Sequence, residues 1–284
     1  MSIDTAIIIC GGIGSRVKEI TKDKIPKIMI PINGKPFVDY LIYSLLLSGI
    51  HSLHFAAGFK ADVLEKYLND FRKKDPIIRE VLSTRVYVEK EPMGTGGAVS
   101  EVIKSYPGAF HGPFLVINGD TLLLHKTDFD DEYNSINDAS KRLDGKEVDF
   151  IMFSANMYND GRYGIIEHEY RGPASPFNNG NEYVTKFRNG EPGYFDINCG
   201  WYITHKKLFE NYQDVTKTLT YPNGKKMDHT INKNIGLGPC SLERDLLPKW
   251  IKEGKRIVIT DINEKAWVDI GEPNTIKRTE ALLK

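Results

Sequence analysis

A glycine-rich segment and three cations follow the first apolar run of the chain. Residues 6–9 are Ala-Ile-Ile-Ile, which is typical of a buried strand, and closely spaced small residues come directly after it. These candidate binding residues are Cys10, Gly11, Gly12, Gly14 and Ser15. Glycines after a strand let the backbone approach a ligand, and consecutive N–H groups in such a turn bind anions. Arg16, Lys24 and Lys27 add positive charge. The segment is therefore predicted to bind a phosphate group.

Two common phosphate-binding motifs do not account for this segment. The P-loop requires G-x-x-x-x-G-K-[ST], and no Gly-Lys-Ser or Gly-Lys-Thr occurs here at that spacing. The dinucleotide fingerprint G-x-G-x-x-G fails because Val17 stands where the third glycine is needed. The chain instead reads G-G-x-G-S-R, followed between Pro26 and Pro36 by P-K-x-M-x-P-x-x-x-K-P. A tight turn that binds no ligand is the alternative interpretation.

A second glycine-rich segment follows an expected strand at residues 85–89. Its candidate residues are Glu91, Gly94, Thr95 and Gly96. Glycines would let a flat base reach backbone N–H and C=O groups that recognise its edge. We therefore predict a nucleobase site here, with a glycine-rich start of the helix expected at 99–106 as the alternative.

A carboxylate ends the next apolar run, Phe114-Leu-Val-Ile-Asn-Gly-Asp120. Ligands of parallel α/β sheets bind at the carboxyl ends of the strands, so Asp120 should lie at the same edge as both glycine segments. Carboxylate oxygens suit Mg²⁺ that is held between a protein and phosphates. Asp120 is therefore a predicted Mg²⁺ ligand, and a turn-forming aspartate is the alternative.

Strand-like and helix-like apolar patterns alternate through the first part of the chain. Strands are expected at 52–57 and 85–89, and helices at 37–46 and 61–71. This alternation predicts an α/β fold with helices on both faces of a parallel sheet. Later strands are expected at 148–155, 183–188, 197–203 and 256–260.

The composition excludes several classes of function. Lysine and arginine together number 38 and so do aspartate and glutamate, so no bulk charge favours nucleic acid or a membrane surface. No apolar run approaches the roughly 20 residues of a membrane span, and no charged-then-apolar leader opens the chain. Cys10, Cys199 and Cys240 form no C-x-x-C pair, which fits a reducing compartment and argues against a zinc ribbon. We expect a cytoplasmic protein.

The combined motifs resemble the signature of sugar-1-phosphate nucleotidylyltransferases, also called NDP-sugar pyrophosphorylases. The resemblance covers residues 6–36, 89–120, 162–203 and 266–275. It implies a single nucleotidyltransferase domain over 1–284 with a three-layer αβα, Rossmann-like fold and a mixed, mostly parallel sheet. It further implies a nucleotide-binding half at 1–120 and a sugar-phosphate-binding half at 121–284, with an inserted loop at 213–240.

The resemblance also implies roles for individual residues. Arg16 and Lys27 would be catalytic, and Asp269 in Ala-Trp-Val-Asp-Ile-Gly would be a second Mg²⁺ ligand beside Asp120. The implied sugar-phosphate-binding residues are Tyr163, Gly164, Lys186, Asn198 and Gly200. The chain departs from the family where a Glu-Lys pair handles the sugar and its phosphate, because Asn189 and Gly190 stand there. Lys186, Arg188 or a residue of a later loop is the expected substitute.

The implied reaction joins an NTP to a sugar 1-phosphate and releases pyrophosphate, without nucleic acid or membrane partners and with a homo-oligomer possible. The motif sequences are most similar to those of the heptose 1-phosphate guanylyltransferases of bacterial surface polysaccharide synthesis. This resemblance implies that GTP is the nucleotide substrate. One alternative is CTP- or dTTP-dependent transfer to glucose 1-phosphate or to a non-sugar phosphate. The other is a nucleotide-binding regulatory protein without activity.

Overall fold

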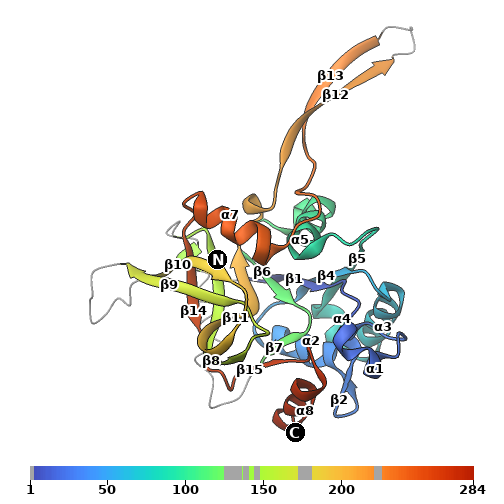
Figure 1. The fold of residues 1–284 in the computed structure, drawn as a ribbon. Helices are drawn as coiled ribbons and strands as arrows, with labels where there is room; N and C mark the ends of the chain where they lie inside the picture. Colours follow the sequence, from blue (N-terminus) through green and yellow to red (C-terminus); the bar gives the residue numbers. More distant parts are fainter. Residues whose placement is uncertain (1–2, 125–135, 137–140, 144–147, 172–180, 221–225) are drawn as a thin grey trace.

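The computed structural model describes residues 3–124, 136, 141–143, 148–171, 181–220 and 226–284 (Figure 1). Its largest element is a nine-stranded sheet in the order β5-β4-β1-β6-β11-β8-β14-β10-β9. These strands are β1 Thr5–Cys10, β4 Ser52–Ala57, β5 Ser83–Val88, β6 Phe114–Asn118, β8 Phe150–Asp160, β9 Ile165–Arg171, β10 Asn181–Arg188, β11 Pro192–Thr204 and β14 Ile257–Asp261. One sheet thus contains strands from both predicted halves of the chain.

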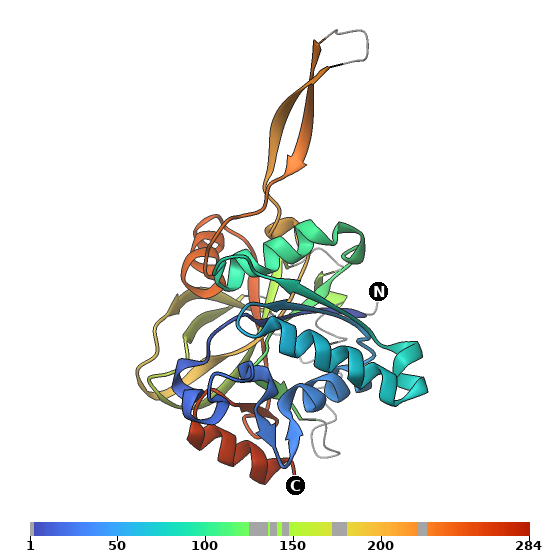
Figure 2. The ribbon, with the colours of Figure 1, turned by 90° about the vertical axis from the view of Figure 1, so that its right-hand side faces the viewer.

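Helices cover both faces of this sheet. The α-helices are α1 Lys18–Thr21, α2 Phe37–Leu47, α3 Ala61–Lys74, α4 Pro76–Val81, α5 Gly94–Ser105, α7 Leu247–Lys252 and α8 Pro273–Leu282. One apolar core contains side chains of α2, α3 and α8, and a second contains side chains of α5 and α7. Figures 1 and 2 show these two sets on opposite sides of the strands. The predicted three-layer αβα arrangement is confirmed.

The sheet is mixed, and its parallel part is confined to two regions. Strands β5, β4, β1 and β6 pair in parallel, as do β8 and β14. The pairs of β11 with β6 and β8, and of β10 with β14 and β9, are antiparallel. The expectation of a mostly parallel sheet therefore holds for the N-terminal part alone, where each strand returns through a helical crossover.

Short elements complete the fold around the sheet edge. Two small antiparallel pairs are formed by β2 Pro31–Ile32 with β3 Lys35–Pro36, and by β7 Thr121–Leu123 with β15 Trp267–Asp269. The 3₁₀ turns are η1 Ser15–Val17, η2 Lys27–Met29, η3 Pro107–Ala109 and η5 Lys206–Leu208, and η6 Leu242–Leu246 is a π-helix. In η6 the Ser241 hydroxyl accepts from the Arg244 N–H at 3.1 Å, which caps the segment at its start.

The predicted insertion at 213–240 contains a long two-stranded hairpin. Strand β12 Tyr212–Thr220 pairs with β13 Lys226–Asn234, while residues 221–225 lie outside the described part. Figures 1 and 2 both show this ribbon standing well clear of the body. Within the described residues, no helix is long and apolar enough to cross a bilayer.

His54 on β4 is buried in the apolar interior with one unsatisfied nitrogen. Its ring lies 5.5 Å from that of Tyr106 and 5.1 Å from that of Phe110, and its Nε2 is 3.3 Å from Ser52 Oγ. Its Nδ1 is buried and has no hydrogen-bond partner among the described residues. Burial, and secondly the Arg85 charge, lowers the pKa of His54 to about 4.

This low pKa predicts acid destabilisation through one residue. The unfolded chain takes up a proton on His54 near pH 6.5, whereas the folded chain does so only near pH 4. Stability from the neutral ring is therefore complete above pH 6.5 and lost as the pH falls to 4, by about 3 kcal/mol. We expect His54→Gln to flatten the free energy of unfolding across this range in urea titrations. The exposed His51→Gln variant is the matched control, and an equal flattening in it would contradict the assignment.

Candidate active site

Two cavities meet at the carboxyl ends of β1 and β6. The smaller has a volume of about 270 Å³ and lies against the first glycine segment, while the larger, of about 730 Å³, extends over β10 and β11. Four residues line both cavities: Lys27, Thr95, Asn118 and Asp120. The cavity beside the glycine segment and the cavity over β10 and β11 therefore meet at Lys27 and Asp120.

The first glycine segment, for which the sequence predicts phosphate binding, forms one wall of the smaller cavity. Cys10, Gly12 and Gly14 line it, while Ser15 is exposed at the start of η1. Gly14 has a φ of 67°, in the left-handed region, and a Cβ there would lie 3.3 Å from the Lys27 Cβ. A glycine is thus needed both for the turn and for the close approach of Lys27.

Arg16 and Lys27 both reach the larger cavity, and each contacts a carboxylate. Arg16 Nη1 donates to Glu272 Oε1 at 3.1 Å, and the Arg16 side chain is 65% exposed. Lys27 Nζ donates to Asp120 Oδ2 and is the less exposed of the two cations. Arg16 can therefore exchange its partner for a substrate at little desolvation cost, whereas Lys27 stays fixed at the junction.

Asp269 is a buried carboxylate in a dense set of donors. Its Oδ1 accepts from the Gly271 N–H at 2.8 Å and from the Thr275 hydroxyl at 3.2 Å. Its Oδ2 accepts from the Tyr163 hydroxyl, whose pKa is raised by burial and by this carboxylate, so the phenol keeps its proton. Arg162 Nη1 lies 3.9 Å from Oδ1. Asp269 therefore organises the C-terminal turn as well as facing the cavity.

Backbone pairing brings Asp120 and Asp269 together from distant parts of the sequence. The Ile270 N–H donates to the Asp120 carbonyl at 2.9 Å, and Asp269 lies opposite Thr121 in the β7–β15 pair. Two carboxylates offer the oxygen donors that hard divalent cations prefer. Nearby, Asn118 Oδ1 is buried without a partner among the described residues, so it also offers an acceptor.

The donor set fits a cation that is shared with a substrate. Across the described residues, no group of three His, Cys, Asp or Glu side chains is placed to hold a metal ion. A cation at Asp120 and Asp269 would therefore take its remaining ligands from phosphate oxygens and water, as Mg²⁺ commonly does.

The predicted sugar-phosphate residues divide into those at the cavity and one outside it. Tyr163, Gly164, Asn198 and Gly200 line the larger cavity. Lys186 does not, because its side chain is 61% exposed and lies 3.8 Å from Glu167. The geometry thus gives no support to Lys186 as a sugar-phosphate ligand.

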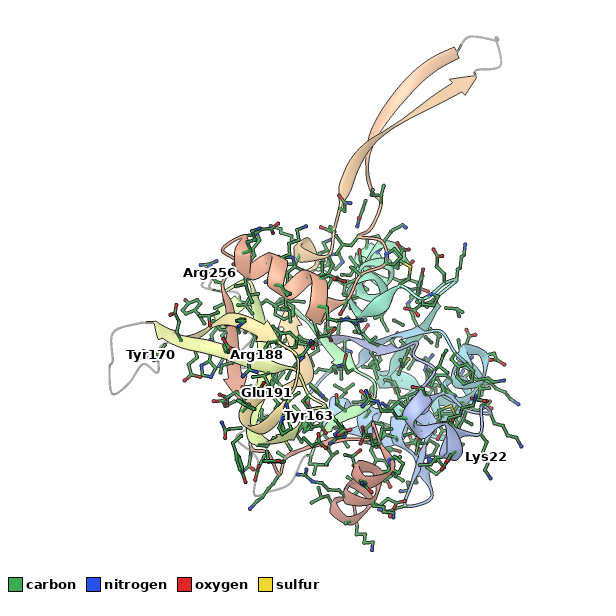
Figure 3. The ribbon with its side chains drawn as sticks, viewed as in Figure 1. Lys22, Tyr163, Tyr170, Arg188, Glu191 and Arg256 are labelled. Atoms are coloured by element: carbon green, nitrogen blue, oxygen red, sulfur yellow. The ribbon has the colours of Figure 1, made fainter. Side chains whose placement is uncertain are left out.

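The expected substitute Arg188 and the departing position Gly190 are both fixed by their surroundings. Arg188 lines the cavity but is held by Glu167 at 2.7 Å and Glu191 at 2.8 Å, as Figure 3 shows for Arg188 beside Glu191. Gly190 is required by packing, since a Cβ would lie 2.3 Å from the Tyr163 carbonyl oxygen. A lysine cannot replace Gly190 in this arrangement.

The second glycine segment has another role than the one expected. Residues 94–97 begin α5 and pack against the segment 238–242, as the helix-start alternative expects, while Gly94 and Thr95 also line the larger cavity. A Cβ on Gly94 would lie 2.5 Å from the Cys240 carbonyl oxygen, and one on Gly96 would lie 2.6 Å from Leu246 Cδ1. The Gly96 N–H donates to Cys240 O at 2.9 Å. These glycines therefore admit a protein segment, while Thr95 remains at both cavities.

Glu89, which the sequence analysis passed over, lies closer to the first glycine segment than Glu91. A Cβ on Gly11 would lie 2.3 Å from Glu89 Oε2, and one on Gly58 would lie 3.2 Å from it. Burial raises the pKa of Glu89. Glu91 is exposed, and neither Glu89 nor Glu91 is among the residues that line the two cavities.

Three charged residues of the larger cavity were not predicted: Arg162, Glu243 and Arg244. Arg162 stands directly before the predicted Tyr163, so its position was the available signal. Glu243 and Arg244 follow the helix cap at Ser241, and their sequence pattern is that of an ordinary helix start. Only the fold of 238–246 over α5 brings them to the cavity.

Comparison with known proteins places the chain among nucleotide-handling enzymes. A family model described as nucleotidyl transferase matches residues 5–230. A D-glycero-alpha-D-manno-heptose 1-phosphate guanylyltransferase of Campylobacter jejuni is 32% identical over 209 residues, covering 73% of this chain and 78% of the relative. The crystal structure of HddC from Yersinia pseudotuberculosis complexed with GMP-PN has a TM-score of 0.64 and 26% identity, covering 99% and 100% of the two chains.

A UDP-glucose pyrophosphorylase complexed with UDP-glucose superposes with a TM-score of 0.70 at 19% identity, covering 99% of this chain and 98% of that one. At this identity the likeness concerns the fold alone, and it confirms the predicted Rossmann-like nucleotidyltransferase architecture.

The two carboxylates should respond differently to loss of charge. Asp120→Asn removes a charge from a partly exposed side chain, so we expect turnover to fall roughly a hundredfold or more with an unchanged melting temperature. Asp269→Asn should lower both the turnover and the melting temperature, because the Asp269 carboxylate also accepts hydrogen bonds from Gly271 and Thr275. Rates across a Mg²⁺ titration and thermal melts would measure this. Asp70→Asn on the exposed part of α3 is the control. Near-normal Mg²⁺-dependent rates in Asp120→Asn would rule out the metal role.

Proposed function

We propose that this chain, which belongs to the nucleotidyl transferase family, couples GTP to a sugar 1-phosphate with release of pyrophosphate. The proposed acceptor is a heptose 1-phosphate, because two of its similar proteins are a heptose 1-phosphate guanylyltransferase and HddC in complex with GMP-PN. The main support for this proposal is that the cavity beside the glycine segment and the larger cavity meet at Lys27 and Asp120. Such a product is an activated glycosyl donor, which suits bacterial surface polysaccharide synthesis.

The proposed reaction is a single in-line displacement. An oxygen of the acceptor phosphate forms a bond to the α-phosphorus of GTP, and the bond from that phosphorus to the β-phosphate bridging oxygen breaks. Pyrophosphate leaves with the electron pair of that bond. No protein nucleophile is needed, so the protein contributes positioning and positive charge.

The proposed displacement assigns a role to each of the two cations. Lys27, fixed at the junction of the cavities, would contact the α-phosphate and the incoming phosphate oxygen. Arg16 would leave Glu272 and donate to the departing pyrophosphate, where charge increases. Mg²⁺, when held by Asp120 and Asp269, would offset phosphate charge and orient the phosphates.

Glu89 is the residue that we propose recognises the base of the nucleotide. An ionised carboxylate only accepts hydrogen bonds, and the guanine edge offers two adjacent donors, N1–H and the N2 amino group. Thymine has one donor between two carbonyl groups, and cytosine has an unprotonated N3 beside its amino group. Both would set a lone pair against the Glu89 oxygens. This argument favours GTP over the dTTP and CTP alternatives.

Arg244 is the proposed ligand of the acceptor phosphate. Each of the other guanidinium groups at the larger cavity contacts a carboxylate: Arg16 and Arg162 contact Glu272, and Arg188 contacts Glu191. Arg244 is exposed at the same cavity and forms no ion pair with a carboxylate among the described residues. Its guanidinium would supply the phosphate-binding cation that Asn189 and Gly190, which line the same cavity, lack.

The alternative of an inactive regulatory protein finds no support at the site. Arg16, Lys27, Asp120 and Asp269 all line one cavity, so the groups needed for transfer are present and adjacent. A glucose 1-phosphate or non-sugar acceptor stays the second candidate, because the larger cavity carries no Glu-Lys pair at Asn189 and Gly190.

Pyrophosphate release with each of the four NTPs tests the proposed function. Heptose 1-phosphate, mannose 1-phosphate, glucose 1-phosphate and inositol 1-phosphate serve as acceptors. We expect kcat/KM with GTP and heptose 1-phosphate to exceed that with dTTP or CTP by about a hundredfold or more. A preference for another base would refute the role of guanine. If nucleotides bind but no combination of NTP and acceptor releases pyrophosphate, the proposed enzymatic activity would be refuted.

Glu89→Gln should weaken GTP binding about ten- to a hundredfold, because a charge-assisted pair of hydrogen bonds is lost. Wild-type affinity should also fall as the pH drops toward the raised pKa of Glu89, since the protonated carboxyl no longer accepts at both oxygens. The Gln variant lacks this contribution. Calorimetric titration with a non-hydrolysable GTP analogue measures both effects. Glu91→Gln, on the exposed acidic residue two positions away, is the matched control, and a larger loss in that variant would assign base recognition to Glu91.

A further inference from the structure

We propose that Glu243 is a positioning residue that couples the nucleotide cavity to the acceptor cavity. Glu243 lies in η6, and its carboxylate faces the larger cavity between α5 and β11. It touches side chains from both elements. The inference rests on the proposed function, because it concerns how the two substrates of that reaction affect each other.

One oxygen of Glu243 is anchored on the nucleotide side. Thr95, which lines both cavities, donates its hydroxyl to Glu243 Oε2 at 2.7 Å. The Ser241 hydroxyl donates to the same oxygen at 3.0 Å. In return, Thr95 Oγ1 accepts from the Leu242 N–H at 2.7 Å, so η6 and the start of α5 are fastened to each other in both directions.

The other oxygen is anchored on the acceptor side. The Tyr202 hydroxyl donates to Glu243 Oε1 at 3.2 Å, and Asn198 Nδ2 donates to the Tyr202 oxygen at 2.7 Å. Tyr202 is fully buried, and burial followed by the Glu243 charge raises its pKa, so its proton stays available for Glu243. Asn198 lines the larger cavity and accepts from the Gly200 N–H at 3.0 Å. A continuous path thus runs from Thr95 to Asn198.

A carboxylate is the side chain that this path requires. Both Glu243 oxygens face hydroxyl donors, and an ionised carboxylate accepts at both. Glutamine has nearly the same shape, but its NH₂ group must face either the Thr95 and Ser241 hydroxyls or the Tyr202 hydroxyl. Tyr202 cannot reverse its bond easily, because Asn198 already donates to its oxygen. Glu243→Gln therefore breaks one of the two links while leaving the packing intact.

The path gives each substrate a means to affect the other. A nucleotide that fixes Thr95 also fixes Glu243, and with it Asn198 and the adjacent Arg244, which both face the acceptor cavity. Ordering these groups in advance lowers the entropic cost of binding the acceptor. By thermodynamic linkage, the acceptor must strengthen nucleotide binding by the same factor.

Calorimetry with a non-hydrolysable GTP analogue, with and without saturating heptose 1-phosphate, measures this factor as a ratio of dissociation constants. In the wild type we expect the dissociation constant without the acceptor to exceed that with it by about fivefold or more. Glu243→Gln should bring this ratio near one, while the affinity for the analogue alone changes much less. Steady-state KM for the acceptor should rise more than KM for GTP. Glu253→Gln, the same change on an exposed residue at the end of α7, should keep the wild-type ratio.

Tyr202→Phe is the second variant, because it removes one hydroxyl from the path and keeps the buried ring. It should also bring the ratio near one, and it decides the question if Glu243→Gln does not fold. A wild-type ratio of one, or a ratio that survives in both variants, overturns the coupling while wild-type turnover leaves the proposed function standing. A wild type that neither binds the analogue nor releases pyrophosphate overturns both.

Discussion

The short antiparallel pairing of β7 with β15 determines where the charged groups of the site lie. It sets Asp269 opposite Thr121 and lets the Ile270 N–H donate to the Asp120 carbonyl at 2.9 Å. Two carboxylates from distant parts of the sequence are thereby fixed at one point beside the carboxyl ends of β1 and β6. The Trp201 indole N–H donates to the Thr121 hydroxyl at 3.1 Å, and that of Trp267 donates to the Cys199 carbonyl at 2.9 Å. Buried hydrogen bonds of this kind keep the pair in place.

Around that point, cations and carboxylates are matched before any substrate arrives. Lys27 contacts Asp120, Arg16 contacts Glu272, and the Arg162 Nη1 lies 3.6 Å from Glu272 Oε2. Paired cations are held in position by fixed partners, which lowers the reorganisation that phosphate binding would otherwise require. The pairs also differ in exposure, so the exposed Arg16 can change partner while the half-buried Lys27 cannot do so without a strong replacement.

The segment 238–246 connects this charge arrangement to the glycine-rich start of α5. Gly94, Gly96 and Gly97 leave room for its backbone, and the Cys240 carbonyl accepts from two of their N–H groups. This close contact carries Glu243 and Arg244 to the larger cavity. A loop that follows the hairpin insertion in the sequence thus becomes part of the site, and the hairpin itself stands apart from it (Figures 1 and 2).

Local sequence patterns determined the elements and one end of the site. The apolar run before Cys10, the spacing of Gly12, Gly14 and Arg16, and the acid at the end of the Phe114 strand all act over a few residues, so they can be read without a fold. The strand at 52–57 agrees with the observed β4 residue for residue. Family resemblance, and not local pattern, pointed to Asp269.

Tertiary structure alone decided which residues share a cavity. Glu89 and Glu91 are both acidic and two positions apart, yet only Glu89 lies against Gly11, because the chain bends at residues 90–91 after β5 has ended. The glycines at 94–97 predicted a ligand site by their local pattern, but the packing of the segment 238–242 on them is visible only in the tertiary structure. Glu243 and Arg244 gave no signal, since Thr95 and Tyr202, the partners of Glu243, are far away in sequence. Contacts between distant segments depend on how whole elements pack, and no local pattern contains that information.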